Sequence, residues 1–322
     1  MLNVVLKFQQ WIKKEAPINT QEMSEQEMWL ALPGVEKEEK ADLLIGLARQ
    51  ASFRGSHGQS LELARAALAV YEEMGATAPT SEVANCHWGI GFAYKALNNN
   101  DQAMEEIDLA IKLYKEANNP FVDNLLRTRA IWSAEMEDWD SALAANLETV
   151  RQNEIEGNPE WEAKSWLNVG FTYSHMKLFP EALEAFYTAR RKFRALKMVP
   201  DVARCDRWLA DTYAELGEGQ LAYEHARKSL NIAELSKERL PIMFSQFVIG
   251  KALMVLGEAL DDAGEYLERS YSQAISAESV DMDWEFIVKV QRERIKLYRL
   301  QGHEDLANDM ESQIKSVTEV IE

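Results

Sequence analysis

The fold is decided by residues 160–198, which read EWEAKSWLNVGFTYSHMKLFPEALEAFYTARRKFRALKM. Side chains three or four residues apart share one face of a helix. On a first helix these are Trp166, Val169, Gly170 and Tyr173. On a second helix they are Ala182, Phe186 and Ala189. The break at Leu178-Phe179-Pro180 therefore predicts a helical hairpin, in which Gly170 and Ala182 let the two helices approach closely.

The same hairpin pattern recurs along the chain with a period of about 40 residues. The small residue of the first helix occurs at Ala48, Gly91, Ala130, Gly170, Ala210 and Gly250. Prolines follow nearly the same interval, at Pro79, Pro120, Pro159, Pro200 and Pro241. Each proline lies where a first helix should begin, a position that tolerates it. The repeat predicts stacked hairpins rather than separate globular domains.

In this pattern the chain resembles the tetratricopeptide repeat (TPR) family. The match is best over residues 166–189, and residues 84–110 and 209–229 carry similar positions. The repeat is longer than the 34 residues typical of the family, because the second helices are extended. In this respect the chain is similar to MalT-like transcription-activator regulatory domains and Rap-like quorum-sensing peptide receptors. The resemblance implies an all-α, right-handed superhelical solenoid of about seven helical hairpins.

The repeat pattern divides the chain into two parts. Residues 1–35 fit it poorly, and their apolar stripe consists of Val4, Val5, Phe8, Trp11 and Ile12. We expect N-terminal capping helices there, with a dimerisation or docking helix as the alternative. Residues 36–315 are expected to form the TPR-like solenoid. Its repeats are predicted at approximately 36–77, 80–118, 120–157, 159–198, 200–238, 241–279 and 282–320.

Composition and charge exclude several classes of function. The net charge of −18 argues against general binding to nucleic acid or anionic membranes. The chain has no long apolar run and no signal-peptide pattern, so we expect a cytoplasmic protein. Cys86 and Cys205 do not suggest a disulfide framework. Because metal-ligand spacings, phosphate-binding loops and nucleophile motifs are missing, we expect no enzyme activity, no catalytic residue, no metal and no cofactor.

In the TPR family the first helices line a concave inner wall. Of 28 positions expected on this wall, 11 are Lys or Arg and 2 are Asp or Glu, which reverses the sign of the whole chain. Aromatic residues lie among these cations. The groove residues predicted from this set are Asn85, Trp88, Phe92, Lys95, Asn124, Arg127, Lys164, Phe171, Arg204, Arg207, Phe247 and Lys251.

A wall of cations and aromatic side chains predicts a non-enzymatic protein- or peptide-binding scaffold or adaptor. Its groove would take an acidic peptide segment or a peptide C-terminus, and a narrower version is a regulatory peptide sensor. The simpler interpretation is that the cations pair with neighbouring carboxylates and only solubilise the wall. Four cations test it: Arg127, Lys164, Arg204 and Arg207. If all four are paired, or lie on the convex side, the ligand argument fails.

Two further functions remain as alternatives. Cations interspersed with aromatic rings would also suit a single-stranded nucleic acid in the groove. The solenoid would instead be structural if it assembled into a homo-oligomer through its N-terminal helix or its C-terminal end. Salt dependence of binding separates the first alternative from a peptide ligand, and molecular size at two protein concentrations tests the second.

Three polar residues depart from the repeat pattern. They are Arg129, Asn146 and Asp206, which stand where apolar or aromatic residues are typical. We interpret them as a local shift of register or a wet contact. The alternative is a buried polar cluster, whose members would all need hydrogen-bond partners.

Overall fold

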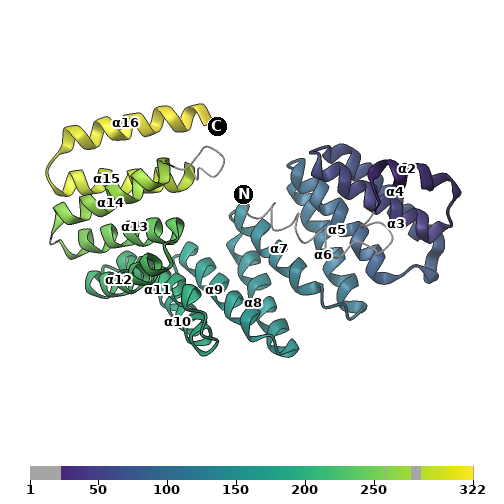
Figure 1. Cartoon of the computed structure of the whole chain (residues 1–322), viewed down its shortest axis with the longest axis horizontal. Coiled ribbons are helices and arrows are strands. Elements are labelled where there is room, and N and C mark those ends of the chain that lie inside the picture. The colour runs from purple at the N-terminus through teal and green to yellow at the C-terminus, as the bar shows by residue number, and fades with distance from the viewer. Residues whose placement is uncertain (1–22, 258, 277–283, 322) are drawn as a thin grey trace. The chain divides into compact units, whose positions relative to one another are not determined.

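The computed structural model describes residues 23–257, 259–276 and 284–321, with only the backbone described beyond residue 315. Within these ranges the regular structure consists of fifteen α-helices and two short 3₁₀ helices, with no strand (Figure 1). The predicted all-α class is confirmed. The stripe from Val4 to Ile12 lies outside the described residues. The division into residues 1–35 and 36–315, the number of repeats and the hand of the superhelix remain predictions.

The chain forms two compact units, residues 1–145 (unit 1) and 146–322 (unit 2), and the boundary falls inside α8 (Trp139–Glu156). Unit 1 contains α2 (Glu25–Ala31), η1 (Leu32–Gly34), α3 (Lys37–Phe53), α4 (His57–Met74), η2 (Gly75–Thr77), α5 (Thr80–Ala96), α6 (Asn100–Glu116) and α7 (Val122–Glu135). Unit 2 contains α9 (Pro159–His175), α10 (Phe179–Ala195), α11 (Val199–Glu215), α12 (Gly219–Ser236), α13 (Arg239–Leu256), α14 (Leu260–Ile275), α15 (Trp284–Leu300) and α16 (Glu304–Ile321).

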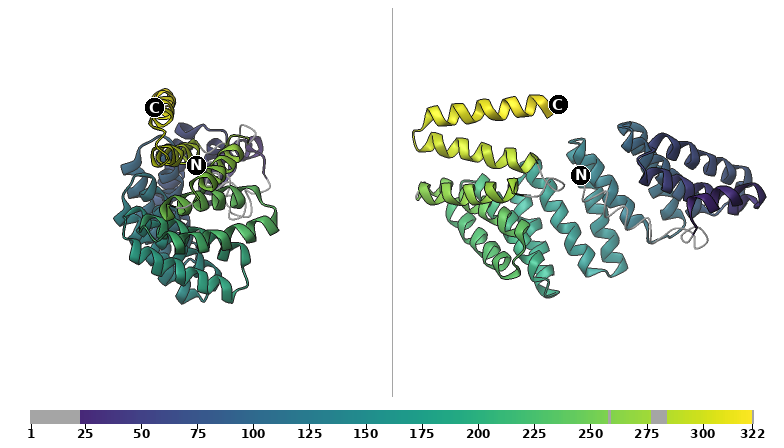
Figure 2. Two further views of the ribbon diagram at one scale, coloured as in Figure 1. Left: turned by 90° about the vertical axis from the view of Figure 1, so that its left-hand side faces the viewer. Right: turned by 45° about the horizontal axis from the view of Figure 1, so that its top comes forward.

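Consecutive helices pack as antiparallel hairpins within each unit. Unit 1 contains the pairs α3/α4 and α5/α6. Unit 2 contains α9/α10, α11/α12, α13/α14 and α15/α16, the last of which is clearest in Figure 2. The first helices of neighbouring hairpins also touch, because α11 contacts α9 and α13, and α13 contacts α15. The first helices of unit 2 therefore form one continuous layer.

The hairpin of residues 160–198 closes as its sequence predicts, as α9 and α10. Phe186 is fully buried, and a Cβ atom added to Gly170 would lie 2.5 Å from its Cδ1 atom. Real Cβ contacts are never so short, so the Phe186 ring fills the space that the missing side chain leaves. Ala182 is fully buried on the same helix. The small residues of the repeat are thus required by the close packing of the paired helices.

The turn between α9 and α10 depends on one residue in the left-handed region. Lys177 has a φ of 60°. Its N–H donates to the Ser174 carbonyl at 3.1 Å, and the Leu178 N–H donates to the Tyr173 carbonyl at 2.9 Å. These bonds satisfy carbonyls that the end of α9 would otherwise leave unpaired. Gly217, with a φ of 79°, ends α11 in the same way.

Helix α13 is the most apolar helix of unit 2. By length and composition it is the one helix among the described ranges that could cross a membrane. It is packed between α12 and α14, and its buried residues include Met243, Phe247, Ile249 and Lys251. Its apolar composition is therefore explained by its place in the core of unit 2.

Two of the residues that depart from the repeat, Asn146 and Asp206, are buried, as the alternative of buried and hydrogen-bonded polar groups requires, whereas Arg129 pairs with a half-exposed carboxylate, which is a wet contact. Asp206 is 1% exposed and Asn146 is 5% exposed. The Asn146 side-chain amide donates to the Thr172 hydroxyl at 3.1 Å. Arg129 Nε lies 2.5 Å from a carboxylate oxygen of Asp108. Each polar group has a partner, because an unpaired one would be costly at such a site.

Candidate functional site

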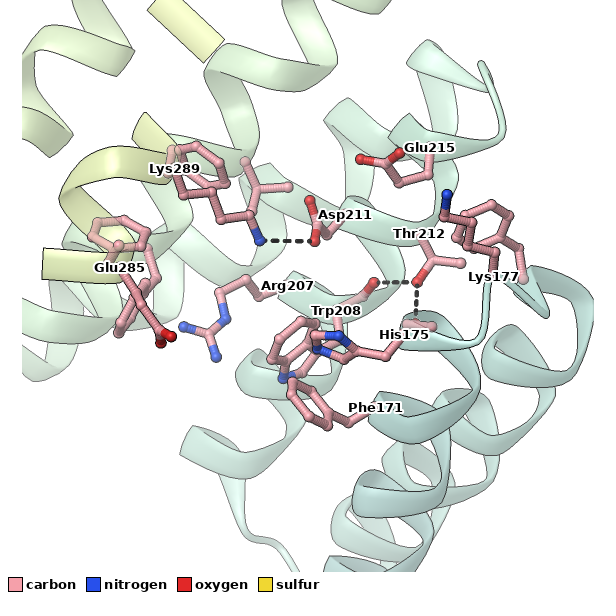
Figure 3. A pocket seen from close by; sticks show the side chains of 16 residues that line it. Phe171, His175, Lys177, Arg207, Trp208, Asp211, Thr212, Glu215, Glu285 and Lys289 are labelled. Atoms are coloured by element: carbon pink, nitrogen blue, oxygen red, sulfur yellow. Dashed lines mark hydrogen bonds and ion pairs between the residues drawn. The ribbon is translucent and has the colours of Figure 1, made fainter. Parts of the chain in front are cut away.

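Unit 2 contains a cavity of about 540 Å³, here called the unit 2 groove. The first helices of four successive hairpins supply most of its lining (Figure 3). Helix α9, the turn after it and the start of α10 contribute Phe171, Ser174, His175, Lys177 and Phe179. Helix α11 contributes Arg207, Trp208, Asp211, Thr212 and Glu215. Helices α13 and α15 contribute Phe244, Phe247, Val248, Glu285, Phe286 and Lys289.

Aromatic rings form much of the groove surface. The rings of Phe171 and Trp208 meet edge to face, with centroids 5.2 Å apart. On the opposite helices, the Phe286 ring lies 4.6 Å from that of Phe244 and 5.4 Å from that of Phe247. These edge-to-face contacts hold the rings in fixed orientations. The groove therefore offers rigid apolar surface from four helices.

Arg207 is the cation placed among these rings. Its guanidinium carbon lies 4.6 Å from the centroid of the Phe244 ring and 5.3 Å from that of Trp208. It makes no ion pair or hydrogen bond with another side chain of the described ranges. Burial lowers the pKa of the Arg207 guanidinium to about 10, so the group remains charged at neutral pH. A desolvated cation without a carboxylate partner has the chemistry needed to bind an anion.

Asp211, one turn further along α11, is paired with lysines rather than with Arg207. It forms an ion pair with Lys251, and Lys289 lies 3.7 Å away (Figure 3). Burial alone would raise the pKa of Asp211, but the two lysines outweigh burial and lower it to about 2. Lys251 also lies 2.7 Å from Glu215. The carboxylate that follows Arg207 by one helical turn is thus held by cations of α13 and α15.

The structure brings three of the predicted groove residues into this cavity, namely Phe171, Arg207 and Phe247. Phe247 is 2% exposed, so its ring is mostly packed in the core. Lys251, which is predicted as a groove cation, is 6% exposed and pairs with Asp211 and Glu215. Lys251 therefore does not line the groove but pairs with two acidic residues that do.

The other two predicted residues of unit 2 do not line the cavity. Lys164 lies 2.6 Å from Glu160, one turn earlier on α9. Arg204 lies 2.5 Å from Asp201 and its side chain is 43% exposed. Both cations are paired with carboxylates of their own helices.

In unit 1, three predicted residues border a small cleft of about 30 Å³. Asn85 accepts a hydrogen bond from the Tyr114 hydroxyl. Trp88 is 4% exposed and packs edge to face against Phe121, with centroids 5.6 Å apart. Phe92 packs on the same core. These side chains are largely used by internal packing, and the cleft has room for water rather than for a peptide.

The remaining predicted residues of unit 1 are also paired. Lys95 lies 3.2 Å from Glu135. Arg127 lies 3.7 Å from Asp123 and donates a hydrogen bond to Asn124. Burial lowers the pKa of the Arg127 guanidinium, and Asp123 partly opposes this effect. Of the four cations that test the ligand argument, only Arg207 has no carboxylate partner within the described ranges.

Several groove residues are absent from the sequence prediction. Ser174, Asp211, Phe244 and Lys289 line the cavity but are not among the twelve residues predicted from the sequence. Trp208, His175 and Phe286 also line the cavity without having been predicted, because their place there depends on how neighbouring helices pack. Among the described residues no group of three or more His, Cys, Asp or Glu is arranged to hold a metal ion.

No protein-family model matches the sequence, and no curated protein is significantly similar to it. Solved structures do match. The apo form of RapI shares a TM-score of 0.71 and 14% identity, over 91% of this chain and 79% of RapI. Aspartyl phosphate phosphatase F from Bacillus subtilis matches with a TM-score of 0.63 and 13% identity, over 98% of this chain and 80% of that protein.

A third match is a signal-transduction ATPase with a tetratricopeptide repeat sensor, PH0952 from Pyrococcus horikoshii. It gives a TM-score of 0.63 and 16% identity, over 89% of this chain and 43% of that protein. The chain therefore spans less than half the length of this relative. Together the matches show that the chain has the helical-repeat fold of TPR and Rap proteins.

Proposed function

We propose that this chain is a non-enzymatic, cytoplasmic peptide-binding protein, a scaffold, adaptor or regulatory sensor whose ligand lies in the unit 2 groove. One observation carries the proposal: the groove combines rigid aromatic surface with the guanidinium of Arg207, which has no carboxylate partner in the described ranges. Its volume of about 540 Å³ falls within the usual range for ligand pockets. Aromatic and Arg side chains are also the residues that most often anchor bound peptides.

The ligand class follows from the chemistry of the lining. The rings would bury apolar side chains, and Arg207 would bind a carboxylate, supplied by an acidic segment or a C-terminus. Solved relatives with the same fold include a protein described as a phosphatase and a protein described as a sensor. Identities below 17% carry the fold and not these activities, so the proposal rests on the groove.

A selection from a random peptide library displayed on phage tests the proposal. The wild-type protein should enrich a defined sequence motif. The Phe244→Ala variant should bind the enriched peptides at least tenfold more weakly, since it removes the ring that stacks on Arg207. Tyr266→Ala is the matched control, because this aromatic residue lies on α14 and does not line the groove. Failure to enrich any motif, or equal losses in both variants, would contradict the proposal.

The two alternatives give different results. A single strand that neutralises several charges would lose affinity by orders of magnitude between 50 and 200 mM salt, whereas a peptide held by one ion pair would not. A self-assembling solenoid would change its sedimentation coefficient with protein concentration. We expect a weak salt dependence of peptide binding and no growth in size.

A further inference from the structure

Resting on the proposed function, we infer that the unit 2 groove recognises one carboxylate, that of a peptide C-terminus whose last side chain is apolar, rather than a run of acidic residues. The inference narrows the ligand from acidic segments in general to a single chemical end group.

The charge of the groove argues against an acidic run. Its lining includes three basic residues, Lys177, Arg207 and Lys289, and three acidic residues, Asp211, Glu215 and Glu285. Lys289 is already engaged with Asp211. Asp211 and Glu215 also pair with Lys251, so a ligand with several carboxylates would find only two lining cations without an ion pair in the described ranges, Lys177 and Arg207, in a chain whose net charge is −18. A ligand with one carboxylate needs only one such cation.

The position of Arg207 suits that one carboxylate. The Phe244 ring covers a face of the guanidinium at 4.6 Å, which leaves the N–H groups at its edge for a partner. A carboxylate binds this edge through two parallel hydrogen bonds. Lys177, the other lining cation without an ion pair among the described residues, is exposed and lies in the turn after α9, so it offers no comparable buried site.

The surroundings of Arg207 favour an apolar group next to the carboxylate. Phe244 packs on Phe286, and Phe286 packs on Phe247, within the same cavity. A C-terminal residue carries its carboxylate and its side chain on one Cα atom. One residue can therefore reach Arg207 and the rings together. An internal Asp or Glu would carry its carboxylate one or two bonds further from its Cα atom and would continue the backbone in both directions.

Glu285 supplies an internal test of the inference. It is exposed, lines the groove and lies on the α15 side of Arg207 (Figure 3). Its carboxylate is not within ion-pair distance of Arg207, but it places negative charge on the same side of the groove, where it would repel the ligand carboxylate. Glu285→Gln should therefore increase affinity for a peptide with a free C-terminus, by roughly twofold to tenfold.

The experiment compares one random peptide library in two display formats, with free C-termini and with the same C-termini extended by a long Gly-Ser tail. Enrichment from the free format alone is the expected result. Equal enrichment from both formats would overturn the inference and leave the proposed function standing. No enrichment from either format would overturn both.

Amidation of an enriched peptide then locates the carboxylate. On the wild-type protein, conversion of the C-terminal carboxylate to an amide should weaken binding at least tenfold. On Arg207→Gln, which removes the cation, amidation should change affinity less than twofold. A similar loss on both proteins would show that the carboxylate binds elsewhere. N-acetyl-leucine is the small-molecule probe, and binding as tight as that of the peptide would contradict a peptide ligand.

Discussion

Asp206 and His225 meet inside unit 2, with Nδ1 of the imidazole 2.7 Å from a carboxylate oxygen, and both residues are more than nine-tenths buried. Arg190 Nε lies 2.9 Å from the same oxygen, and the Tyr187 hydroxyl lies 3.1 Å from Nε2 of His225. Unit 1 contains a corresponding pair with the residue types exchanged: His87 is on the first helix, α5, and Glu106 is on the second helix, α6. Both pairs are separated by 19 residues. The repeat thus keeps a polar link between paired helices.

Removal of the Asp206 carboxylate should destabilise unit 2 strongly. Asp206→Ala leaves Arg190 and His225 buried without their anion, and breaking a buried ion pair in this way costs about 3–5 kcal/mol. Asp108→Ala is the matched control, since that carboxylate is 50% exposed and its pair with Arg129 is worth less than about 1 kcal/mol. Urea denaturation followed by circular dichroism measures both. Equal shifts of the two unfolding midpoints would show that the Asp206 pair contributes no more to stability than the exposed Asp108 pair.

The close contact between Gly170 and Phe186 predicts that Gly170→Ala destabilises the fold, whereas alanine at an uncrowded glycine should stabilise it. Gly170→Ala forces a Cβ atom into a fully buried ring and should cost about 1–3 kcal/mol. Gly89→Ala places a Cβ atom 3.8 Å from that of Ala64, an ordinary contact, and should stabilise helix α5 by up to about 1 kcal/mol. Thermal unfolding of the two variants compares them. Stabilisation by Gly170→Ala would show that the helices do not pack as described.

The lowered pKa of Asp211 predicts how the stability of the folded protein depends on pH. Because the folded-state pKa of about 2 lies below the usual 3.8, the ionised carboxylate stabilises the fold above pH 4, and this contribution is lost as the pH falls toward 2. The lowering corresponds to about 2 kcal/mol. Wild-type protein should therefore exceed Asp211→Asn in stability at pH 6, and the difference should shrink by about this amount at pH 2. A difference that is constant with pH would exclude the ion pairs with Lys251 and Lys289.

The cysteines should be unreactive in the folded protein. Cys86 and Cys205 are fully buried free thiols, and burial raises the pKa of both, that of Cys205 to about 12. Since the thiolate is the reactive form, Ellman's reagent should label neither residue at pH 8 without denaturant and both in urea. Rapid labelling of the native protein would place these thiols at the surface instead.

Much of the fold is readable from the sequence, because the small residues at the hairpin contact recur in register. The close approach at Gly170 and Ala182 needs only helical spacing and side-chain size. The ion pairs of Arg127, Lys164 and Arg204 were also readable, since each has an acid three or four residues earlier on its helix. The number of cations on the wall therefore exceeds the number free to bind a ligand, because these three are paired.

The special position of Arg207 could not be read in the same way. Asp211 follows it by four residues and by helical spacing alone would be its partner. Lys251 and Lys289 of two later helices hold that carboxylate instead, and Phe244 of α13 covers the guanidinium. These contacts depend on how four hairpins stack, and helical periodicity along one chain segment does not contain that information.

The most direct test of the central claim measures one enriched peptide against two matched variants, Arg207→Met and Arg204→Met, by isothermal titration calorimetry. The two arginines are one turn apart on α11, but Arg204 is paired with Asp201 and does not line the groove. We predict that Arg207→Met weakens binding at least tenfold and that Arg204→Met changes it less than twofold. Equal effects of the two substitutions, or unchanged binding by Arg207→Met, would contradict the account.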